Sequence, residues 1–122
     1  MRKKKTRQVL IIDNDLVFVN KLKNSIHMLG FEVTVSNSPG LAIEALQQAK
    51  YELVVADSSL PGISSKEFIQ NLKKRDDQIP IFITSDSTDL DLKESVMLCG
   101  ASDFFLKKFE FDRLLLKIYK LA

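Results

Sequence analysis

The sequence predicts an α/β fold in which one parallel, doubly wound sheet is covered by helices on both faces. Five segments rich in aliphatic and β-branched residues alternate along the chain with five segments whose apolar residues recur at helical spacing. Strands that alternate with helices in this way are typical of a parallel sheet. The third strand segment contains the uninterrupted apolar run Leu53, Val54, Val55 and Ala56, as expected for a strand that is covered on both faces.

Strands are expected in five segments of the chain: residues 7–12, 31–35, 52–56, 79–83 and 102–106. The first (RQVLII) and the fourth (IPIFI) are short apolar runs, whereas the second (FEVTV) alternates apolar and polar residues. Crossovers between parallel strands are right-handed almost without exception. Periodicity alone does not give the order of the strands in the sheet.

Helices are expected between these strands, and local signals place several of their ends. Ser38 supplies an N-cap for the second helix, and Pro39 suits its first position. Either Ser64 or Ser65 can cap the third helix, and Gly30 is suited to end the first. The fourth helix, at about residues 89–98, has the weakest apolar pattern. Apolar residues mark the inner faces of the other four helices: Val17, Leu22, Ile26 and Leu29; Leu41, Ala42, Ala45, Leu46 and Ala49; Phe68, Ile69 and Leu72; Leu114, Leu115, Ile118 and Leu121.

The composition fits one globular domain. Of the 122 residues, 45% are apolar and 28% are charged, which is the balance of a folded protein rather than a disordered one. No apolar run approaches the ~20 residues that span a membrane, so a cytoplasmic location is expected. Five of the 18 basic residues lie in the first seven positions, which leaves 13 against 16 acidic residues in the remainder. We therefore expect a basic tail at residues 1–7 that leads into the first strand, and a mildly acidic domain at residues 8–122.

The cysteine and histidine content excludes several kinds of site. Cys99 is the only cysteine, so the sequence has no internal disulfide and no zinc site built from cysteines. His27 is the only histidine and lies within a helical pattern, which favours a structural role over a catalytic or metal-binding one. The function must therefore rest on other side chains.

Polar residues gather at the predicted carboxyl ends of the strands. In open α/β sheets these ends share the edge at which ligands bind. If the strands concerned are neighbours, carboxylates, hydroxyls and one ammonium group converge there. Such a set suits Mg²⁺, which takes oxygen ligands, together with a phosphoryl group, and a carboxylate can itself accept a phosphoryl group. The residues are Asp13, Asn14 and Asp15 after the first strand, Asp57 after the third, Thr84 and Ser85 after the fourth, and Lys107 after the fifth.

Four stretches give the chain a family resemblance over essentially its whole length. They are VLIIDND, ELVVADSSLPG, IPIFITS and GASDFFLKKF. Together they resemble the response-regulator receiver domain of two-component signalling, a phosphorelay system. The resemblance implies a flavodoxin-like (βα)5 sandwich with five parallel strands in the order 2-1-3-4-5, an arrangement for which the family supplies a known example.

The resemblance also implies a role for each matching residue. It makes Asp57 the phosphoacceptor, and it makes Lys107 the lysine that binds the phosphoryl group. Mg²⁺ is the implied cofactor, and the domain catalyses at most its own phosphoryl transfer and dephosphorylation, so it is not an enzyme in the usual sense. Its implied metal ligands are Asp13, Asn14, Asp57 and the backbone carbonyl of Ser59, and its implied switch residues are Thr84 and Phe104.

The implied partners are proteins. A sensor histidine kinase or a phosphotransfer protein would donate the phosphoryl group. Phosphorylation would then reshape the face formed by the fourth helix, the fifth strand and the fifth helix, which would contact an output domain or a second copy. No membrane is implied, and nucleic acid would not be bound through this domain.

Three residues depart from the family pattern. Asn14 stands where the second acid of the metal site is usual, so one negative charge is lost; Asp15 can compensate, although it also suits the N-cap of the first helix. Lys108 replaces the usual proline, so the bond before it is expected to be trans. Phe104 lacks the hydroxyl of tyrosine and is equally well interpreted as an ordinary core residue. Asp86 and Ser59 are expected to tune the lifetime of the phosphorylated state.

Two alternatives follow from these departures and from the first loop. The chain can be a degenerate receiver, which binds proteins without needing phosphorylation. More remotely, Asp13 and Asp15 also resemble the start of a haloacid-dehalogenase-type phosphatase, with Asp13 as the nucleophile. A flavin-binding flavodoxin is disfavoured because the first loop is acidic and has no glycine, so it would repel a phosphate.

Overall fold

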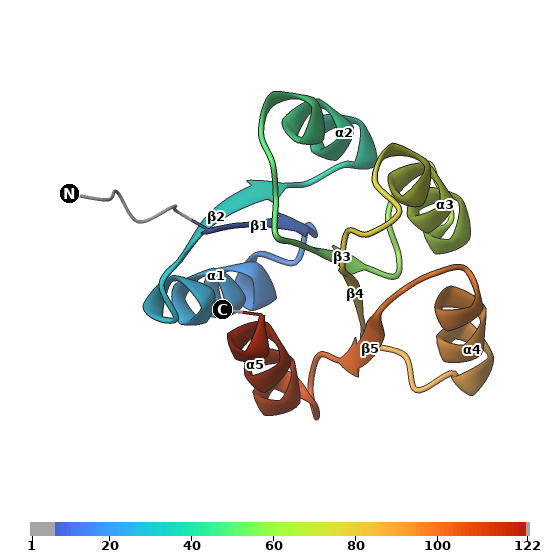
Figure 1. The fold of residues 1–122 in the computed structure, drawn as a ribbon. Helices are drawn as coiled ribbons and strands as arrows, with labels where there is room; N and C mark the ends of the chain where they lie inside the picture. Colours follow the sequence, from blue (N-terminus) through green and yellow to red (C-terminus); the bar gives the residue numbers. More distant parts are fainter. Residues whose placement is uncertain (1–6, 122) are drawn as a thin grey trace.

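In the computed structural model, which describes residues 7–121 (Figure 1), five strands alternate with five helices. The predicted alternation is therefore confirmed. The basic segment at residues 1–7 lies outside the described residues except for Arg7. The strands are β1 (Arg7–Ile12), β2 (Phe31–Ser36), β3 (Leu53–Asp57), β4 (Ile81–Ser85) and β5 (Asp103–Leu106), and the helices are α1 (Leu16–Met28), α2 (Pro39–Gln48), α3 (Ser65–Arg75), α4 (Leu90–Leu98) and α5 (Phe111–Lys120).

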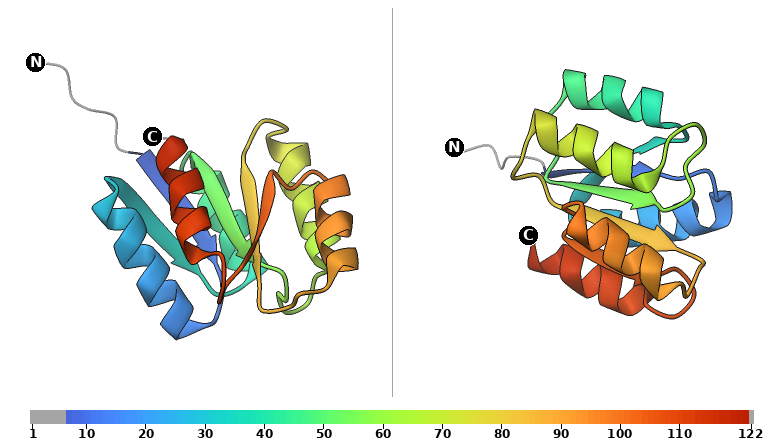
Figure 2. Two further views of the ribbon diagram at one scale, coloured as in Figure 1. Left: turned by 90° about the horizontal axis from the view of Figure 1, so that it is seen from below. Right: turned by 90° about the vertical axis from the view of Figure 1, so that its right-hand side faces the viewer.

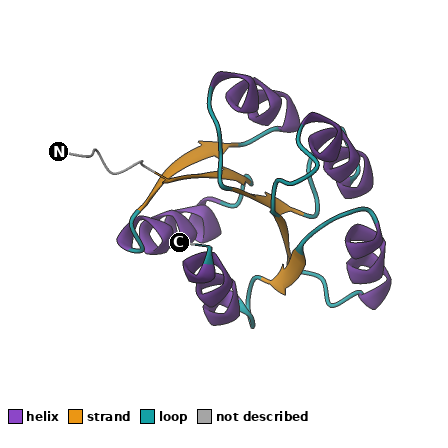
Figure 3. Cartoon of the chain, in the orientation of Figure 1, coloured by secondary structure: helices purple, strands orange, loops and turns teal. Residues whose placement is uncertain are grey.

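The strands form one parallel sheet in the order β2-β1-β3-β4-β5, as predicted. Figure 2 shows the strands with their arrowheads at the same edge. Helices α1 and α5 cover one face of the sheet, and α2, α3 and α4 cover the other (Figures 1 and 3). The carboxyl ends of β1, β3, β4 and β5 are therefore neighbours along one edge, which is the condition that the predicted site requires.

The core consists of two apolar layers, one on each face of the sheet. Alternate residues along each strand enter different layers because successive side chains point to opposite faces. In β3, Leu53 and Val55 pack against α1 and α5, whereas Val54 and Ala56 pack on the side of α2, α3 and α4. This alternation also decides on which face the polar residue after each strand emerges.

Capping and turn residues mark the two ends of the helices much as the sequence predicts. Asp15 caps α1 by accepting a hydrogen bond from the backbone N–H of Phe18 at 3.3 Å. Ser38 caps α2, and Ser64 rather than Ser65 caps α3. After α1, Gly30 adopts a φ of 96°, a conformation that glycine tolerates without strain.

For β4 and α4, the apolar pattern of the sequence predicts the element less well than it does elsewhere. β4 begins at Ile81, two residues later than expected. The N–H of Ile79 donates to Asp76 in the preceding turn at 3.3 Å, and Pro80 has no N–H to give to the ladder, although its carbonyl accepts the N–H of Val54 at 3.0 Å. Helix α4 buries Val96 fully, and most of its other side chains are exposed, which explains its weak apolar pattern. Within residues 7–121, no helix has the length and apolar character of a membrane span.

Candidate functional site

The strand register brings four of the predicted polar residues to one face of the sheet, whereas Ser85 follows Ile83 of the other layer. Asp57 at the end of β3 pairs with Thr84 in β4. Both follow, by two positions, a residue that packs under α1 and α5, namely Val55 and Phe82. Since side chains alternate along a strand, Asp57 and Thr84 point toward the α1 and α5 face. Asp13 follows Ile11 of the same layer, and Lys107 follows Phe105.

Lys107 lies at the centre of the carboxylate cluster. Its Nζ is 2.8 Å from Oδ2 of Asp13, 3.3 Å from Oδ1 of Asp57 and 3.7 Å from Oδ2 of Asp15. The side chains of Lys107 and Asp13 are only 5% and 1% exposed, whereas Asp15 is partly exposed. Oδ1 of Asp13 also accepts the backbone N–H of Asp15 at 2.9 Å. Three carboxylates therefore surround one ammonium group, and the cluster carries an excess of negative charge.

The pKa values of the two central groups reflect this arrangement. Burial raises the pKa of Asp57 above its ordinary value, and the charge of Asp13 adds to the effect; Lys107 and the N–H of Ser59 oppose it. Burial acts to lower the pKa of Lys107, but its hydrogen bonds and ion pairs with Asp13 and Asp57 outweigh burial and raise it. Lys107 is therefore charged at neutral pH, and the Asp57 carboxylate is poorly solvated for a charged group.

Thr84 carries a buried hydroxyl group without a partner. The residue is 1% exposed, and its Oγ1 makes no hydrogen bond to any group within residues 7–121. Its backbone carbonyl accepts the N–H of Ser58 at 2.8 Å, which joins the end of β4 to the residue after Asp57. A buried donor left unpaired costs about 1–3 kcal/mol.

Phe104 is separate from the charged cluster. It is 3% exposed and packs in the other apolar layer, with Ile83, Val96 and Ala101. Its backbone carbonyl accepts a hydrogen bond from Nη2 of Arg113 at 2.6 Å. The packing is that of a core phenylalanine, as the simpler interpretation expects, and its role as a switch remains a prediction.

The oxygen donors around Asp57 fit a magnesium ion only in part. Asp13 and Asp57 supply carboxylates, and Oδ2 of Asp13 has no hydrogen bond of good geometry despite its ion pair with Lys107. Asn14 and Ser59 are exposed at the same edge. Within residues 7–121 no three His, Cys, Asp or Glu side chains are grouped as metal ligands. Two carboxylates with amide and carbonyl oxygens are a donor set that Mg²⁺ accepts, but one acid is replaced by Asn14.

The structure adds contacts that the sequence patterns do not single out. The hydroxyl of Ser58 donates to that of Ser85 at 2.9 Å, which ties the loop after β3 to the end of β4. The strand pairing of Asp57 with Thr84 implies this contact, since both serines directly follow them. The ring of Phe18 lies under Nζ of Lys107 at 4.7 Å. Nothing in the sequence distinguishes Phe18 from an ordinary core residue.

A second group of charges fixes the turn between β5 and α5. Glu110 accepts the backbone N–H of Leu106 at 3.0 Å and pairs with Nε of Arg113 at 2.8 Å. Arg113 also pairs with Asp103 at 3.0 Å. Residues 7–121 contain no cis peptide bond, so the bond before Lys108 is trans, as predicted. These contacts hold both ends of the loop that carries Lys107.

The Glu110 carboxylate is expected to stabilise the fold in a pH-dependent way. Its pKa lies below the ordinary value of 4.5 because it accepts the Leu106 N–H and pairs with Arg113. A lowered pKa adds stability above the ordinary value, which is lost as the pH falls through the folded-state pKa. In urea unfolding, Glu110→Gln should lower the free energy of unfolding by about 1 kcal/mol at neutral pH.

The difference from wild type should shrink when the pH is taken below 4.5. Glu44→Gln, a change at an exposed position of α2, serves as the control and should have little effect at either pH. A difference for Glu110→Gln that stays constant across the two pH values would contradict the prediction.

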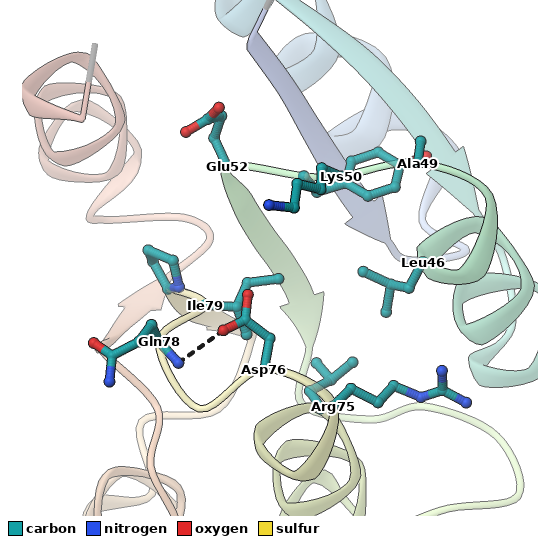
Figure 4. A pocket seen from close by; sticks show the side chains of 11 residues that line it. Leu46, Ala49, Lys50, Glu52, Arg75, Asp76, Gln78 and Ile79 are labelled. Atoms are coloured by element: carbon teal, nitrogen blue, oxygen red, sulfur yellow. Dashed lines mark hydrogen bonds between the residues drawn. The ribbon is translucent and has the colours of Figure 1, made fainter.

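A cavity of about 720 Å³ lies at the opposite edge of the sheet. It is bounded by the ends of α2 and α3 and by the loops that lead into β3 and β4 (Figure 4). Gln78 donates its backbone N–H to Asp76 there at 3.0 Å. None of the clustered residues around Asp57 lines it, so it is distinct from the candidate site. Its lining consists of Leu46, Ala49, Lys50, Tyr51, Glu52, Leu72, Arg75, Asp76, Gln78, Ile79 and Pro80.

Comparison with solved structures confirms the fold. The chain is similar to a putative response regulator from Chloroflexus aurantiacus, with a TM-score of 0.87, 23% identity and coverage of 96% of this chain and 98% of the other. It is also similar to the chemotaxis response regulator CheY4 of Vibrio cholerae, with a TM-score of 0.85, 19% identity and coverage of 97% and 100%.

Comparison of sequences gives the family. The chain is 31% identical over 106 residues to the transcriptional regulatory protein FixJ of Bradyrhizobium diazoefficiens, with 87% of this chain and 52% of the relative covered. It is 28% identical to the uncharacterised transcriptional regulatory protein YkoG of Bacillus subtilis, with 90% and 48% covered. The chain thus spans about half the length of these relatives. The family model described as the response regulator receiver domain matches residues 9–119. With the fold and the strand-end cluster, this match shows that the chain belongs to the response regulator receiver domain family.

Proposed function

We propose that this receiver domain is phosphorylated on Asp57 in a reaction that depends on Mg²⁺. The observation that carries the proposal is the position of Lys107, whose Nζ lies 3.3 Å from Asp57 and 2.8 Å from Asp13. A buried ammonium between two carboxylates at the carboxyl edge of a parallel sheet is suited to neutralise a phosphoryl group on one of them. The pairing of Asp57 with Thr84 adds a hydroxyl on the same face.

In the proposed reaction, an oxygen of the Asp57 carboxylate attacks the phosphorus of a phosphohistidine on a partner kinase or phosphotransfer protein. The oxygen–phosphorus bond forms as the bond from phosphorus to the imidazole nitrogen breaks, and the histidine leaves with that electron pair. The ammonium group of Lys107, which pairs with Asp13 and Asp57 before the reaction, would then also donate hydrogen bonds to the phosphoryl oxygens. Bound Mg²⁺ would supply further charge neutralisation, held by Asp13, Asn14, Asp57 and the carbonyl of Ser59.

Thr84 and Phe104 are proposed to report the phosphorylated state. The unpaired hydroxyl of Thr84 gains a partner only when a phosphoryl oxygen is present, so phosphorylation favours a conformation in which the two meet. Phe104 lies in β5 next to Ile83, the residue before Thr84, and would repack as the end of β4 moves. The face formed by α4, β5 and α5 would then change its affinity for a partner.

The partners are proposed from the family and from the relatives. The matched relatives are transcriptional regulatory proteins of about twice this length, which supports an output that regulates transcription through another domain or protein. The kinase donor, a dimer through the α4, β5 and α5 face and a cytoplasmic location all belong to this proposal. The domain itself is proposed to act in signalling, with no catalysis beyond its own phosphoryl transfer and dephosphorylation.

The proposal is tested by intact-mass spectrometry after incubation with acetyl phosphate and Mg²⁺. Wild type should gain the mass of one phosphoryl group, and Asp57→Asn should gain none. Asp76→Asn, which changes an exposed aspartate far from the site, should behave as wild type. A mass gain that persists in Asp57→Asn, or no gain in wild type over a range of Mg²⁺ concentrations, would reject Asp57 as the phosphoacceptor.

A degenerate receiver is the second candidate function, and the replacement of an acid by Asn14 favours it. An amide at position 14 brings no negative charge to the metal site, and Lys107 already pairs with Asp13 and Asp57, so this candidate function expects metal binding too weak to support phosphorylation. This candidate predicts that wild type and Asp57→Ala bind the protein's natural partner equally under phosphorylating conditions. Weaker or stronger binding by Asp57→Ala would argue for the phosphorylated receiver instead.

The phosphatase alternative has less support. Asp13 is 2% exposed, and both of its oxygens are engaged, one by the N–H of Asp15 and the other by Lys107. A nucleophile in that position would first have to lose its ion pair and then become accessible to a phosphate ester. The family match favours the receiver, and a lack of turnover of generic phosphate esters is the expected result for this chain.

A further inference from the structure

The buried ring of Phe18 gives Lys107 a contact unlike its carboxylate partners. Nζ of Lys107 stands over the ring face, 4.7 Å from its centroid. An aromatic face attracts an ammonium group through the ring quadrupole at distances up to about 6 Å, most strongly when the cation is removed from water. Lys107 is 8% exposed and Phe18 is 7% exposed, so solvent screens this pair little.

The first turns of two helices fix the ring in place. Phe18 is the third residue of α1, and its N–H is held by the N-cap Asp15. Its ring packs against that of Phe111, the first residue of α5, with centroids 6.2 Å apart and planes at 81°. Nζ of Lys21 lies over the ring of Phe111 at 4.1 Å. The two rings therefore lie between two ammonium groups and are braced from both helices.

The ring does something for Lys107 that a carboxylate cannot do. A carboxylate accepts a hydrogen bond and so occupies one of the three N–H groups of the ammonium. The ring attracts the whole charge without occupying a particular N–H group. The ring thereby helps to hold Lys107 near Asp57 without taking an N–H group beyond those that already face Asp13 and Asp57.

We propose that Phe18 is a positioning residue for Lys107, and that its ring face holds the ammonium group within reach of a phosphoryl group on Asp57. An aliphatic residue could occupy the same place between α1 and the sheet but would offer the ammonium no such attraction. This inference rests on the proposed function, since it assigns Phe18 a part in the phosphorylation of Asp57.

The first test separates the ring's effect on Lys107 from its packing. Phe18→Leu should lower the rate of phosphorylation by acetyl phosphate at saturating Mg²⁺ by about threefold to tenfold. Phe31→Leu is the matched control because Phe31 is a buried phenylalanine of the same apolar layer, contributed by β2. It should lose stability but stay within about twofold of the wild-type rate, since a distant cavity costs stability rather than reactivity.

Combination with Lys107→Met shows whether Phe18 acts through the lysine. If it does, Phe18→Leu causes no further decrease in the Lys107→Met background. Equal rates for Phe18→Leu and Phe31→Leu, or the same decrease with and without Lys107, would overturn the proposal.

A measurement on unphosphorylated wild type needs no variant to fold and no reaction to occur. The ε-methylene protons of Lys107 should show an upfield ring-current shift in the proton NMR spectrum. Ordinary shifts for these protons would overturn the proposal even in a protein that is phosphorylated on Asp57. An upfield shift in a protein that takes up no phosphoryl group would leave the contact standing and reject the proposed function instead.

Discussion

Lys107→Met is expected to slow phosphorylation of Asp57 by about a hundredfold or more, which is the usual cost of removing one group that stabilises charge in a transition state. The ammonium pairs with Asp13 at 2.8 Å and with Asp57 at 3.3 Å. Within residues 7–121 neither carboxylate has another cationic partner that could replace it. Methionine fills a similar volume and carries no charge. The measurement is the rate of phosphoryl incorporation from acetyl phosphate, followed by intact mass at a fixed Mg²⁺ concentration.

Lys108→Met provides the matched control. Lys108 is the next residue in the chain and is exposed. The same substitution there removes the same charge from the protein but leaves the ammonium group of Lys107 in the site. Its rate should stay within about twofold of wild type, because an exposed charge is screened by water and salt. Equal rates for Lys107→Met and wild type would mean that the buried ammonium does not take part in the reaction.

The second large effect is expected from Asn14→Asp, which restores the acid that the family usually carries. Two unit charges ~4 Å apart interact by about 4 kcal/mol at an effective dielectric constant of ~20. Solvation offsets much of this energy because Asn14 is exposed. We therefore expect Mg²⁺ to bind about tenfold more tightly, which corresponds to roughly 1.4 kcal/mol, and phosphorylation to reach its maximum at a lower Mg²⁺ concentration.

Mg²⁺ titration by calorimetry measures the Asn14→Asp effect directly. Asn24→Asp adds the same charge at an exposed position farther along α1 and should leave the affinity nearly unchanged. If Asn14→Asp binds Mg²⁺ no better than wild type, Asn14 is not beside the metal. If both variants bind Mg²⁺ more tightly by the same factor, the gain in affinity comes from the net charge of the protein rather than from a metal ligand at position 14.

The fold followed from local patterns that are strong in this sequence. Residues 53–56 are covered on both faces, as their apolar run predicts, and Ser38 with Pro39 marks the start of α2 as expected. The order of the strands came from the family resemblance rather than from periodicity, because pairing between strands depends on contacts distant in sequence. The late start of β4 depends on whether the residues around Pro80 join the ladder, which the apolar pattern of that segment does not reveal.

The sequence predicts the residues of the candidate site that lie at strand ends. It does not predict the contacts that depend on how a helix packs against the sheet. Asp57 and Thr84 follow apolar strands that pair in register, so their meeting follows from the topology. The contact between Lys107 and Phe18 depends instead on how the first turn of α1 lies against the sheet. The helical spacing places Val17 on the inner face of this helix, and that prediction is wrong: Val17 is 82% exposed, whereas Phe18 is 7% exposed. Only the three-dimensional structure assigns the two residues to opposite sides of the helix.

The most direct test is a crystal structure of the protein with Mg²⁺ and beryllofluoride, a mimic of the phosphoryl group. Beryllium should be bonded to an oxygen of Asp57, with Nζ of Lys107 and Oγ1 of Thr84 each hydrogen-bonded to fluorine. Mg²⁺ should lie between Asp13, Asp57 and the carbonyl of Ser59, with Asn14 bound directly or through water. A structure in which Asp57 carries no beryllofluoride, while Lys107 still pairs with Asp13 and the Thr84 hydroxyl remains unpaired, would contradict the phosphorylation of Asp57.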